Sequence, residues 1–289
     1  MTTLWRERPV GVVGLGLIGG SIGLDLMALG LDVRGLVHRQ ATAERARKRG
    51  LARQVSTDPA VLTDCALVLL ALPLDQLLEP SRDLLAALPP GAVIADLASV
   101  KAPVLAAWEP LVPRFVATHP MAGTAEAGVE AGLPNLFRGR PWVATPTTHT
   151  DREALGQMRA LAGALGGHWL ECDAHSHDRA VALISHLPVF VGAALLRSAE
   201  RGAEVPPAEG LPQLVRALAS SGFADTTRVG GGNPELGALM ARSNRKALAE
   251  ALGQYRLALD GLEELLLRDD WVGLLRELEG CRDLRPEFL

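Results

Sequence analysis

A glycine-rich turn near the N-terminus is the feature that most constrains the fold. Residues 12–19 read Val-Val-Gly-Leu-Gly-Leu-Ile-Gly, which continue an apolar run and lead into a segment of helical length. The three glycines form GxGxxG: Gly14 allows a tight turn, Gly16 lets a pyrophosphate approach the backbone, and Gly19 lets the helix pack closely on the strand. The unpaired N–H groups at the start of that helix would bind phosphate. The pattern therefore predicts a dinucleotide site, and a glycine-rich turn in some other α/β protein is the alternative.

The pattern of apolar residues differs between the two halves of the chain. Short apolar runs bounded by Gly, Pro or Asp predict strands up to residue 172, at GVVGLG, DVRGLVH, ALVLLALP, AVIADLAS, RFVATHP, PWVATP and HWLEC. Segments of helical length separate the first of them, at 19–30, 41–50 and 75–87, which is the alternation of a parallel sheet. After residue 173, apolar residues recur at helical spacing, interrupted at 202–210 and 230–234. We predict an α/β, Rossmann-type, mostly parallel sheet domain over residues 1–172 and an all-helical domain over residues 173–289.

Composition narrows the class of function. The chain has 289 residues, is 48% hydrophobic and carries a net charge of -4, so it offers no basic field for nucleic acid or for an anionic membrane surface. Its three cysteines are too far apart in sequence to indicate a disulfide framework or a cysteine metal site. No leader peptide is evident, and we expect no apolar run of the roughly 18 residues that a membrane span needs. The expectation is a cytoplasmic protein that acts on a small molecule.

The residues that follow the second predicted strand bear on the choice of cofactor. NAD-binding proteins usually carry an acidic residue there, which accepts hydrogen bonds from the ribose hydroxyls. This chain has His38, Arg39 and Gln40 instead, and cations at this place suit the 2′-phosphate of NADP. We predict NADP, with NAD possible; the alternative is that Arg39 is a solvated arginine in an arginine-rich chain. The expected cofactor contacts are Gly14, Gly16, Leu17, Ile18, Gly19, His38, Arg39, Gln40, Leu72, Pro73 and Ser99.

Polar residues follow two further predicted strands. Ser99 and Lys101 lie in DLASVK, and His119 lies in THPMAG. Ligands of open α/β sheets bind at such strand ends, and histidine is the usual acid–base group near neutral pH. Pro120 restricts His119 to an extended conformation, which would direct the imidazole toward the crevice, where Ser99 could bond both it and a substrate hydroxyl. A hydrogen-bonded structural histidine is the alternative.

The helical half contributes two candidates. In HDRAVALISHLPVF, Pro188 cannot bond the carbonyl of Ile184, which predicts a kink near His186. Such a kink often serves packing alone. Arg228 stands between small residues and a glycine cluster, an unusual place for a solvated arginine. Helix capping or an interdomain ion pair is its alternative role.

Taken in order, these motifs resemble one family over nearly the whole chain. GVVGLGLIGGS, DLASVK, HPMAGT, NLF, HDRAVALISHLP and SSGFADTTRVGGGNPELG are similar to the prephenate and arogenate dehydrogenases of tyrosine biosynthesis, most closely the cyanobacterial arogenate type. The resemblance implies an NAD(P)-dependent oxidative decarboxylation of a cyclohexadienol. Hydride leaves the carbon that bears the ring hydroxyl, and the ring carboxylate departs as carbon dioxide.

The resemblance also implies roles for individual residues. His119 would accept the hydroxyl proton and Ser99 would bond the same hydroxyl. Arg228 and His186 would hold substrate carboxylates, Thr124 would be a further pocket residue, and no metal is implied. The family's helical domain forms a homodimer.

The chain differs from some members of this family at two positions, and two other functions are alternatives to the one that the resemblance implies. Some prephenate-using relatives carry glutamate where this chain has Ala125 and tryptophan where it has Gly237, so their substrate selectivity cannot be carried over to this chain. The likeness to the arogenate type, together with the segment His38, Arg39 and Gln40, favours arogenate over prephenate. Another two-domain reductase of the 6-phosphogluconate-dehydrogenase type is one alternative, although the only lysine beyond Lys101 is Lys246. A non-catalytic NADP-binding sensor is the other.

Overall fold

One sheet organises the N-terminal part of the chain. The computed structural model describes residues 4–124, 126–206 and 209–288. The strands are β1 (Val10–Val13), β2 (Val33–Leu36), β3 (Gln54–Ser56), β4 (Leu67–Leu70), β5 (Val93–Asp96), β6 (Phe115–Pro120), β7 (Pro141–Ala144) and β8 (His168–Glu171). They form one sheet in the order β3-β2-β1-β4-β5-β6-β7-β8. Strands β1 to β6 are parallel, β7 is antiparallel to β6, and β8 is parallel to β7. The predicted mostly parallel sheet is confirmed, and β3 is a strand that the apolar pattern missed.

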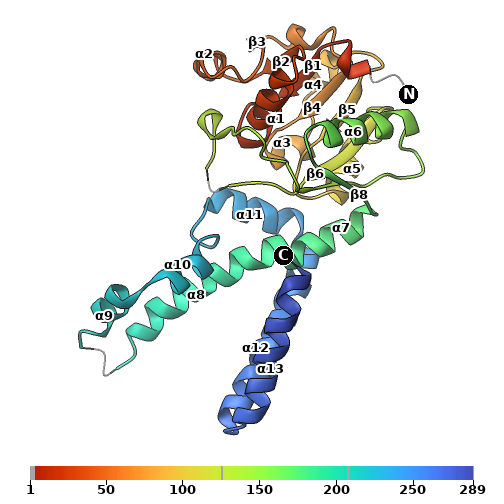
Figure 1. The fold of residues 1–289 in the computed structure, drawn as a ribbon. Coiled ribbons are helices and arrows are strands. Elements are labelled where there is room, and N and C mark those ends of the chain that lie inside the picture. The colour runs from red at the N-terminus through yellow and green to blue at the C-terminus, as the bar shows by residue number, and fades with distance from the viewer. Residues whose placement is uncertain (1–3, 125, 207–208, 289) are drawn as a thin grey trace.

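Both faces of this sheet are covered by helices (Figure 1). The helices are α1 (Leu17–Ala28), α2 (Gln40–Lys48), α3 (Leu74–Leu78), α4 (Arg82–Ala87), α5 (Ala102–Trp108) and α6 (Arg152–Ala164). Helices α1, α2 and α6 contribute to one apolar cluster and α3 and α5 to the other, and alternate residues of β1 and β4 enter each cluster. Burial on both faces explains why these strands read as continuous apolar runs.

The predicted helix at 75–87 is two helices. Helix α3 ends before Pro80, whose ring cannot continue the hydrogen-bond ladder. Helix α4 then begins at a new cap, where the Ser81 hydroxyl accepts from the Leu84 N–H at 3.2 Å. A proline and a capping serine thus divide a segment whose apolar spacing suggested one element.

The remaining chain is helical, as predicted. The helices are α7 (Ala174–Val181), α8 (Leu187–Ala203), α9 (Leu211–Leu218), α10 (Ser221–Thr227), α11 (Pro234–Ser243), α12 (Arg245–Leu267) and α13 (Trp271–Leu284). The structure describes no strand after Glu171 in residues 172–206 and 209–288. A π-helical turn at Ala182–His186 joins α7 to α8 and ends two residues before Pro188. The disruption expected near His186 is therefore confirmed as a π turn, a common cause of helix irregularity.

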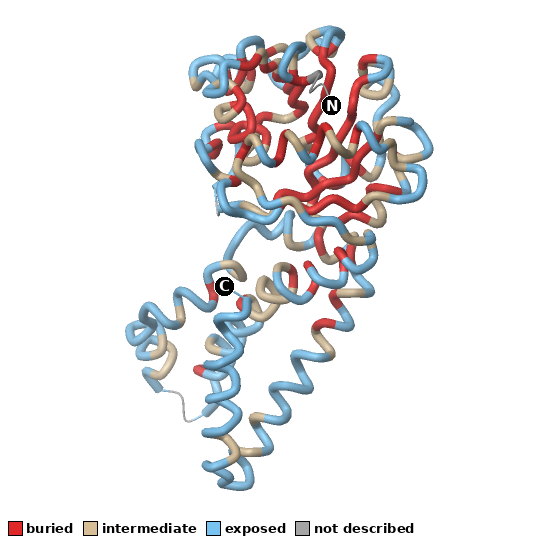
Figure 2. Tube along the Cα trace, turned by 45° about the vertical axis from the view of Figure 1, so that its right-hand side comes forward, coloured by how far each residue is buried: buried red, intermediate tan, exposed pale blue. Residues whose placement is uncertain are grey.

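Two helical arms extend away from the sheet. Helix α8 forms one, and the hairpin of α12 and α13 forms the other (Figure 1). Buried residues concentrate in the sheet domain, whereas exposed residues predominate in the α12–α13 hairpin and in the outer half of α8 (Figure 2). The arms carry exposed apolar side chains, among them Leu196, Leu257, Leu267, Trp271, Val272 and Leu275.

The expectation that no apolar run is long enough to span a membrane is wrong. The continuous helical run Ala174–Ala203 has 30 residues, and the mean hydropathy of its most apolar window is 1.8, enough in length and composition to cross a membrane. Only 22% of that window is buried within this chain. Its N-terminal turns, however, carry His177 and Asp178, which are buried and hydrogen-bonded to neighbouring side chains.

The loop after Arg228 crosses helix α8 at close range, with a glycine on each side of the contact. A Cβ added to Gly230 would lie 2.2 Å from the Ala193 nitrogen, so only glycine permits this approach. Gly192 faces the same contact from α8, where its added Cβ would lie 3.0 Å from the Gly230 nitrogen. The glycine cluster thus serves helix packing and sets the path of the chain from α10 to α11.

Candidate functional site

The glycine turn has the geometry of a phosphate site. Gly14 has φ +91°, and a Cβ there would lie 2.3 Å from the Ala71 carbonyl oxygen. A Cβ on Gly19 would lie 1.9 Å from the Gly14 carbonyl oxygen, which shows how closely α1 packs on the turn. At Gly16, by contrast, no atom lies within 4 Å of an added Cβ, so a ligand can approach the backbone. Helix α1 begins here without a side-chain cap, leaving its first N–H groups available to an anion.

A cavity of about 590 Å³ surrounds this turn at the carboxyl ends of β1, β2 and β4. Of the predicted cofactor residues, six line it: Gly14, Gly16, His38, Arg39, Leu72 and Pro73. Leu17, Ile18, Gly19, Gln40 and Ser99 are not among its lining residues. The cavity also includes Thr42, Arg45, Thr57 and Gln76, which the sequence motifs did not indicate. These residues and the open backbone at Gly16 fit a dinucleotide.

His119 lies at the same edge of the sheet, in β6. It is 9% exposed, and its Nδ1 lies 3.0 Å from Nε2 of His177 in α7. The second ring nitrogen of His177, Nδ1, lies 2.8 Å from the Asp178 carboxylate. The expected Ser99–His119 hydrogen bond is absent from the described chain, in which half-buried Ser99 has no side-chain hydrogen bond. The imidazole is oriented by the helical half instead.

A buried ion pair between Lys101 and Asp96 links the ends of β5 and β6 next to His119. Lys101 and Asp96 are fully buried, and the Lys101 ammonium donates to the Asp96 carboxylate and, at 2.6 Å, to the Thr118 carbonyl. Asp96 also accepts from the Ala98 N–H at 2.9 Å and the Thr118 N–H at 3.1 Å. Burial raises the pKa of Asp96 and lowers the pKa of Lys101, and the attraction between them opposes both shifts. The pair fixes the chain on either side of Ser99 and immediately before His119.

Asp178 joins the helical half to the sheet domain. Its carboxylate accepts from the backbone N–H groups of Lys101 at 2.7 Å and Ala102 at 2.9 Å, at the start of α5. The Asn244 side-chain amide donates to the Asp178 carbonyl at 2.7 Å and lies 3.3 Å from His186 Nδ1. These contacts come from three distant segments, so sequence spacing could not indicate them.

One ring nitrogen of His186 has no partner among residues 4–124, 126–206 and 209–288. The Asn244 amide donates to Nδ1, so the neutral ring carries its proton on Nε2. That Nε2 is buried and has no hydrogen bond to any residue that the structure describes, and the whole residue is 0% exposed. A buried donor without an acceptor is unfavourable by about 1–3 kcal/mol, which a bound carboxylate would relieve.

The other predicted substrate residues are exposed. Arg228 directly follows α10, and its guanidinium has no hydrogen bond or ion pair with the part of the chain that is described. An interdomain ion pair within one chain is therefore not its role. The Thr124 hydroxyl accepts from the Glu126 N–H at 3.2 Å, and no hydrogen bond joins Thr124 to His119 within that part of the chain. Ala125 lies outside the described residues, and Gly237 lies in α11, half-buried.

The surroundings of His119 keep it neutral. Burial lowers its pKa well below the usual value, and the nearby Lys101, His177 and His186 lower the pKa further. Burial also lowers the pKa of His186. Both imidazoles are therefore uncharged near pH 7, and His119 can accept a proton.

The two buried histidines predict a loss of stability in mild acid. Their pKa values are lowered on folding from 6.5, so between that value and the folded pKa the unfolded chain binds more protons. Each group should then reduce the free energy of unfolding by up to about 1.4 kcal/mol per pH unit below pH 6.5, with no contribution above it. Urea unfolding of the wild type and His119→Asn across this range measures the effect. Equal pH slopes for the two proteins would contradict it.

The comparisons with known proteins agree with this geometry. The family model described as prephenate dehydrogenase, nucleotide-binding domain, matches residues 22–171, and the model described as prephenate dehydrogenase, dimerization domain, matches residues 173–280. Among curated proteins, the chain is 28% identical to the cyclohexadienyl dehydrogenase of Zymomonas mobilis over 286 residues, which cover 96% of this chain and 95% of that protein.

Two solved structures are similar over almost the whole chain. The arogenate dehydrogenase of Synechocystis is 39% identical with a TM-score of 0.82, covering 97% of this chain and 100% of that one. The prephenate dehydrogenase of Aquifex aeolicus, solved with hydroxyphenyl propionate and NAD+, is 27% identical with a TM-score of 0.88, covering 98% of both chains. The resemblance found in the sequence motifs is thus confirmed, and the chain belongs to the prephenate dehydrogenase family.

Proposed function

We propose that this protein catalyses the oxidative decarboxylation of arogenate or prephenate with a nicotinamide cofactor, as an enzyme of tyrosine biosynthesis. The observation that carries the proposal is a buried, neutral His119 at the sheet edge that also carries the glycine turn. Family membership supports the same activity. Neither the reductase nor the sensor alternative has an observation in its favour.

Oxidation of the ring carbon that bears the hydroxyl group requires a base that takes the hydroxyl proton. When bound, the nicotinamide supplies the hydride acceptor. His119 takes the proton of the ring hydroxyl, and Ser99, after β5, bonds the same oxygen. Loss of the ring carboxylate as carbon dioxide then yields an aromatic ring. A positioned base of this kind contributes about 10² to 10⁴ in rate.

Two groups are proposed to hold the substrate carboxylates. His186 offers a buried Nε2 donor that has no partner in the described part of the chain, and Arg228 offers an exposed guanidinium that can bind a carboxylate through two hydrogen bonds. Thr124 is proposed as a further pocket residue. The 39% identity to the Synechocystis arogenate dehydrogenase over almost the whole chain supports arogenate as the preferred substrate.

Turnover of purified protein tests the function directly. Arogenate and prephenate would each be incubated with NADP and with NAD while reduced nicotinamide is followed by absorbance. We expect turnover with at least one substrate and a higher kcat/KM for arogenate with NADP. No turnover with either substrate would overturn the proposal.

Arg228→Met should weaken substrate binding. Removing one charge-assisted contact of about 1.5–3 kcal/mol corresponds to a rise of roughly 10- to 100-fold in KM, with cofactor KM unchanged. Arg282→Met removes an exposed arginine elsewhere in the helical half and serves as the control. An unchanged substrate KM in Arg228→Met would exclude the assigned role.

We propose NADP as the preferred cofactor. His38 and Arg39 line the cavity after β2, at the place where the 2′-phosphate would lie, and Arg45 lines the same cavity. Arg39 is exposed, so its side chain is free to close on a phosphate.

Arg39→Asp should reverse this preference. The new carboxylate would repel the 2′-phosphate and could accept from the ribose hydroxyls of NAD, so kcat/KM should fall for NADP and rise for NAD. Losing a charge-assisted contact corresponds to about tenfold or more in kcat/KM for NADP. Arg152→Asp, an equal charge change at the exposed start of α6, is the control. A wild-type preference for NAD would contradict the assignment.

We also propose that the protein is cytoplasmic and that its two domains comprise residues 1–172 and 173–289.

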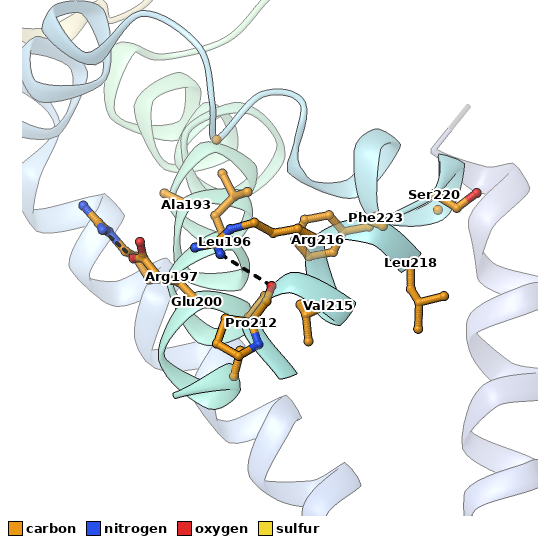
Figure 3. A pocket seen from close by; sticks show the side chains of 15 residues that line it. Ala193, Leu196, Arg197, Glu200, Pro212, Val215, Arg216, Leu218, Ser220 and Phe223 are labelled. Carbon is orange, nitrogen blue, oxygen red and sulfur yellow. Dashed lines mark hydrogen bonds and ion pairs between the residues drawn. The ribbon is translucent and has the colours of Figure 1, made fainter. Parts of the chain in front are cut away.

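We propose further that the functional unit is a homodimer. A groove of about 1090 Å³ between α8, α9 and α10 is lined by apolar side chains that include Leu196, Val215, Leu218 and Phe223 (Figure 3). A second copy covering this groove and the exposed apolar arms would explain their composition. Sedimentation velocity gives the mass, and a monomer at micromolar concentration would contradict the dimer.

A further inference from the structure

Three buried side chains form a hydrogen-bonded series behind the proposed base. His119 Nδ1 lies 3.0 Å from His177 Nε2, and His177 Nδ1 lies 2.8 Å from Asp178 Oδ1. His177 is 3% exposed and Asp178 6% exposed, so water does not compete for these contacts. The two histidines come from different halves of the chain, and the proposed reaction as stated above does not use His177 or Asp178.

The hydrogen-bond partners of Asp178 determine where the protons lie. Both oxygens of its carboxylate accept from backbone N–H groups, Oδ1 from Lys101 and Oδ2 from Ala102, so Asp178 acts here as an acceptor. His177 must therefore donate its Nδ1–H to Asp178. The other ring nitrogen of His177, Nε2, is then the acceptor in its contact with His119, so His119 donates its own Nδ1–H there. Nε2 of His119 is left without a proton.

We infer that His177 and Asp178 are positioning residues that hold His119 in the tautomer whose Nε2 can act as the base. The inference rests on the proposed function, in which His119 accepts the hydroxyl proton. The alternative tautomer carries a proton on Nε2 and cannot accept another at that atom. The helical half thus sets the chemical state of a residue that belongs to the sheet domain.

The same series accommodates the charge that the reaction creates. The O–H bond of the substrate breaks, an N–H bond forms at His119 Nε2, and His119 becomes cationic while hydride leaves for the cofactor. The Lys101 ammonium near His119 disfavours that charge, and Asp96 lies beyond Lys101. Passing the Nδ1 proton to His177 moves the charge next to Asp178, whose carboxylate stabilises it.

Nitrogen NMR of the histidine rings tests the tautomer without any substrate. The chain has 7 histidines, so ¹⁵N-histidine labelling gives few signals, and His119→Asn identifies the signal of His119. We expect a proton on Nδ1 and a bare nitrogen at Nε2. A proton on Nε2 in the wild type would overturn the inference, even if turnover is normal.

Two substitutions at His177 separate orientation from charge transfer. His177→Gln keeps one donor for Asp178 and one acceptor for His119, so the tautomer should be retained. His177→Phe removes both, His119 should shift to the Nε2–H form, and kcat should fall by about 10²-fold with KM for the cofactor unchanged. The Gln variant should recover part of that loss, which a purely structural role of the ring would not explain.

His175→Gln is the matched control, because His175 lies on the same helix and is exposed. It should leave kcat, the acid limb of the pH profile and the His119 tautomer unchanged. Wild-type kcat in His177→Phe would overturn the inference. Absence of turnover in the wild type would instead refute the proposed function, and the NMR result would still decide the tautomer. If His177→Phe does not fold, the wild-type spectrum and the Gln variant give the answer.

Discussion

His119→Asn should reduce kcat by about 10² to 10⁴, the usual contribution of a positioned general base, with little change in cofactor affinity. Asparagine keeps an amide that can bond His177 but has no group that accepts a proton near neutral pH. His119 is not among the residues that line the cofactor cavity, so binding of reduced nicotinamide should remain. Steady-state kinetics and fluorescence titration with the reduced cofactor measure the two effects.

Two comparisons sharpen this experiment. His168→Asn replaces an exposed histidine in β8 and should leave kcat unchanged. A non-catalytic NADP-binding sensor predicts instead that His119→Asn alters no measurable property. Retention of wild-type turnover by His119→Asn would therefore remove His119 from the mechanism.

Lys101→Met should destabilise the fold by about 3–5 kcal/mol, because it leaves the Asp96 carboxylate buried without its cation. The same change removes the bond that the ammonium makes to the Thr118 carbonyl, next to His119. We therefore expect reduced turnover as well as a lower midpoint of urea unfolding.

A double variant distinguishes the charge from the shape of the side chains. In Lys101→Met with Asp96→Asn no uncompensated charge remains, so much of the lost stability should return. Arg53→Met removes a partly exposed ion pair with Asp32, at 3.5 Å, and should change stability by less than about 1 kcal/mol. Equal destabilisation by Lys101→Met and Arg53→Met would show that burial of the pair is unimportant.

The elements of the fold were largely predictable, because parallel strands covered on both faces are continuous apolar runs. The pattern failed where a local effect or a short length dominated. β3 has only three residues, and its middle residue alone is buried, so it has no apolar run to detect. Helices α3 and α4 share one apolar pattern, but Pro80 and the Ser81 cap separate them.

The site was predictable one residue at a time. Pro188 indicated the irregular helix near His186, and Pro120 indicated the extended backbone at His119, because proline acts on its immediate neighbours. The partners of these residues were not predictable. Ser99 was the expected partner of the imidazole, and His177, more than fifty residues away, is the observed one.

By itself, the sequence determined the glycine turn, the order of strands and helices, and the residue types at the strand ends, because backbone sterics and apolar periodicity act over a few residues. Only the tertiary structure decided the chemical states of those residues. Burial and the charges around His119 make it neutral, and the series through His177 to Asp178 directs its free nitrogen. Desolvation and hydrogen-bond partners depend on which distant segments pack together, and that packing is a property of the whole fold.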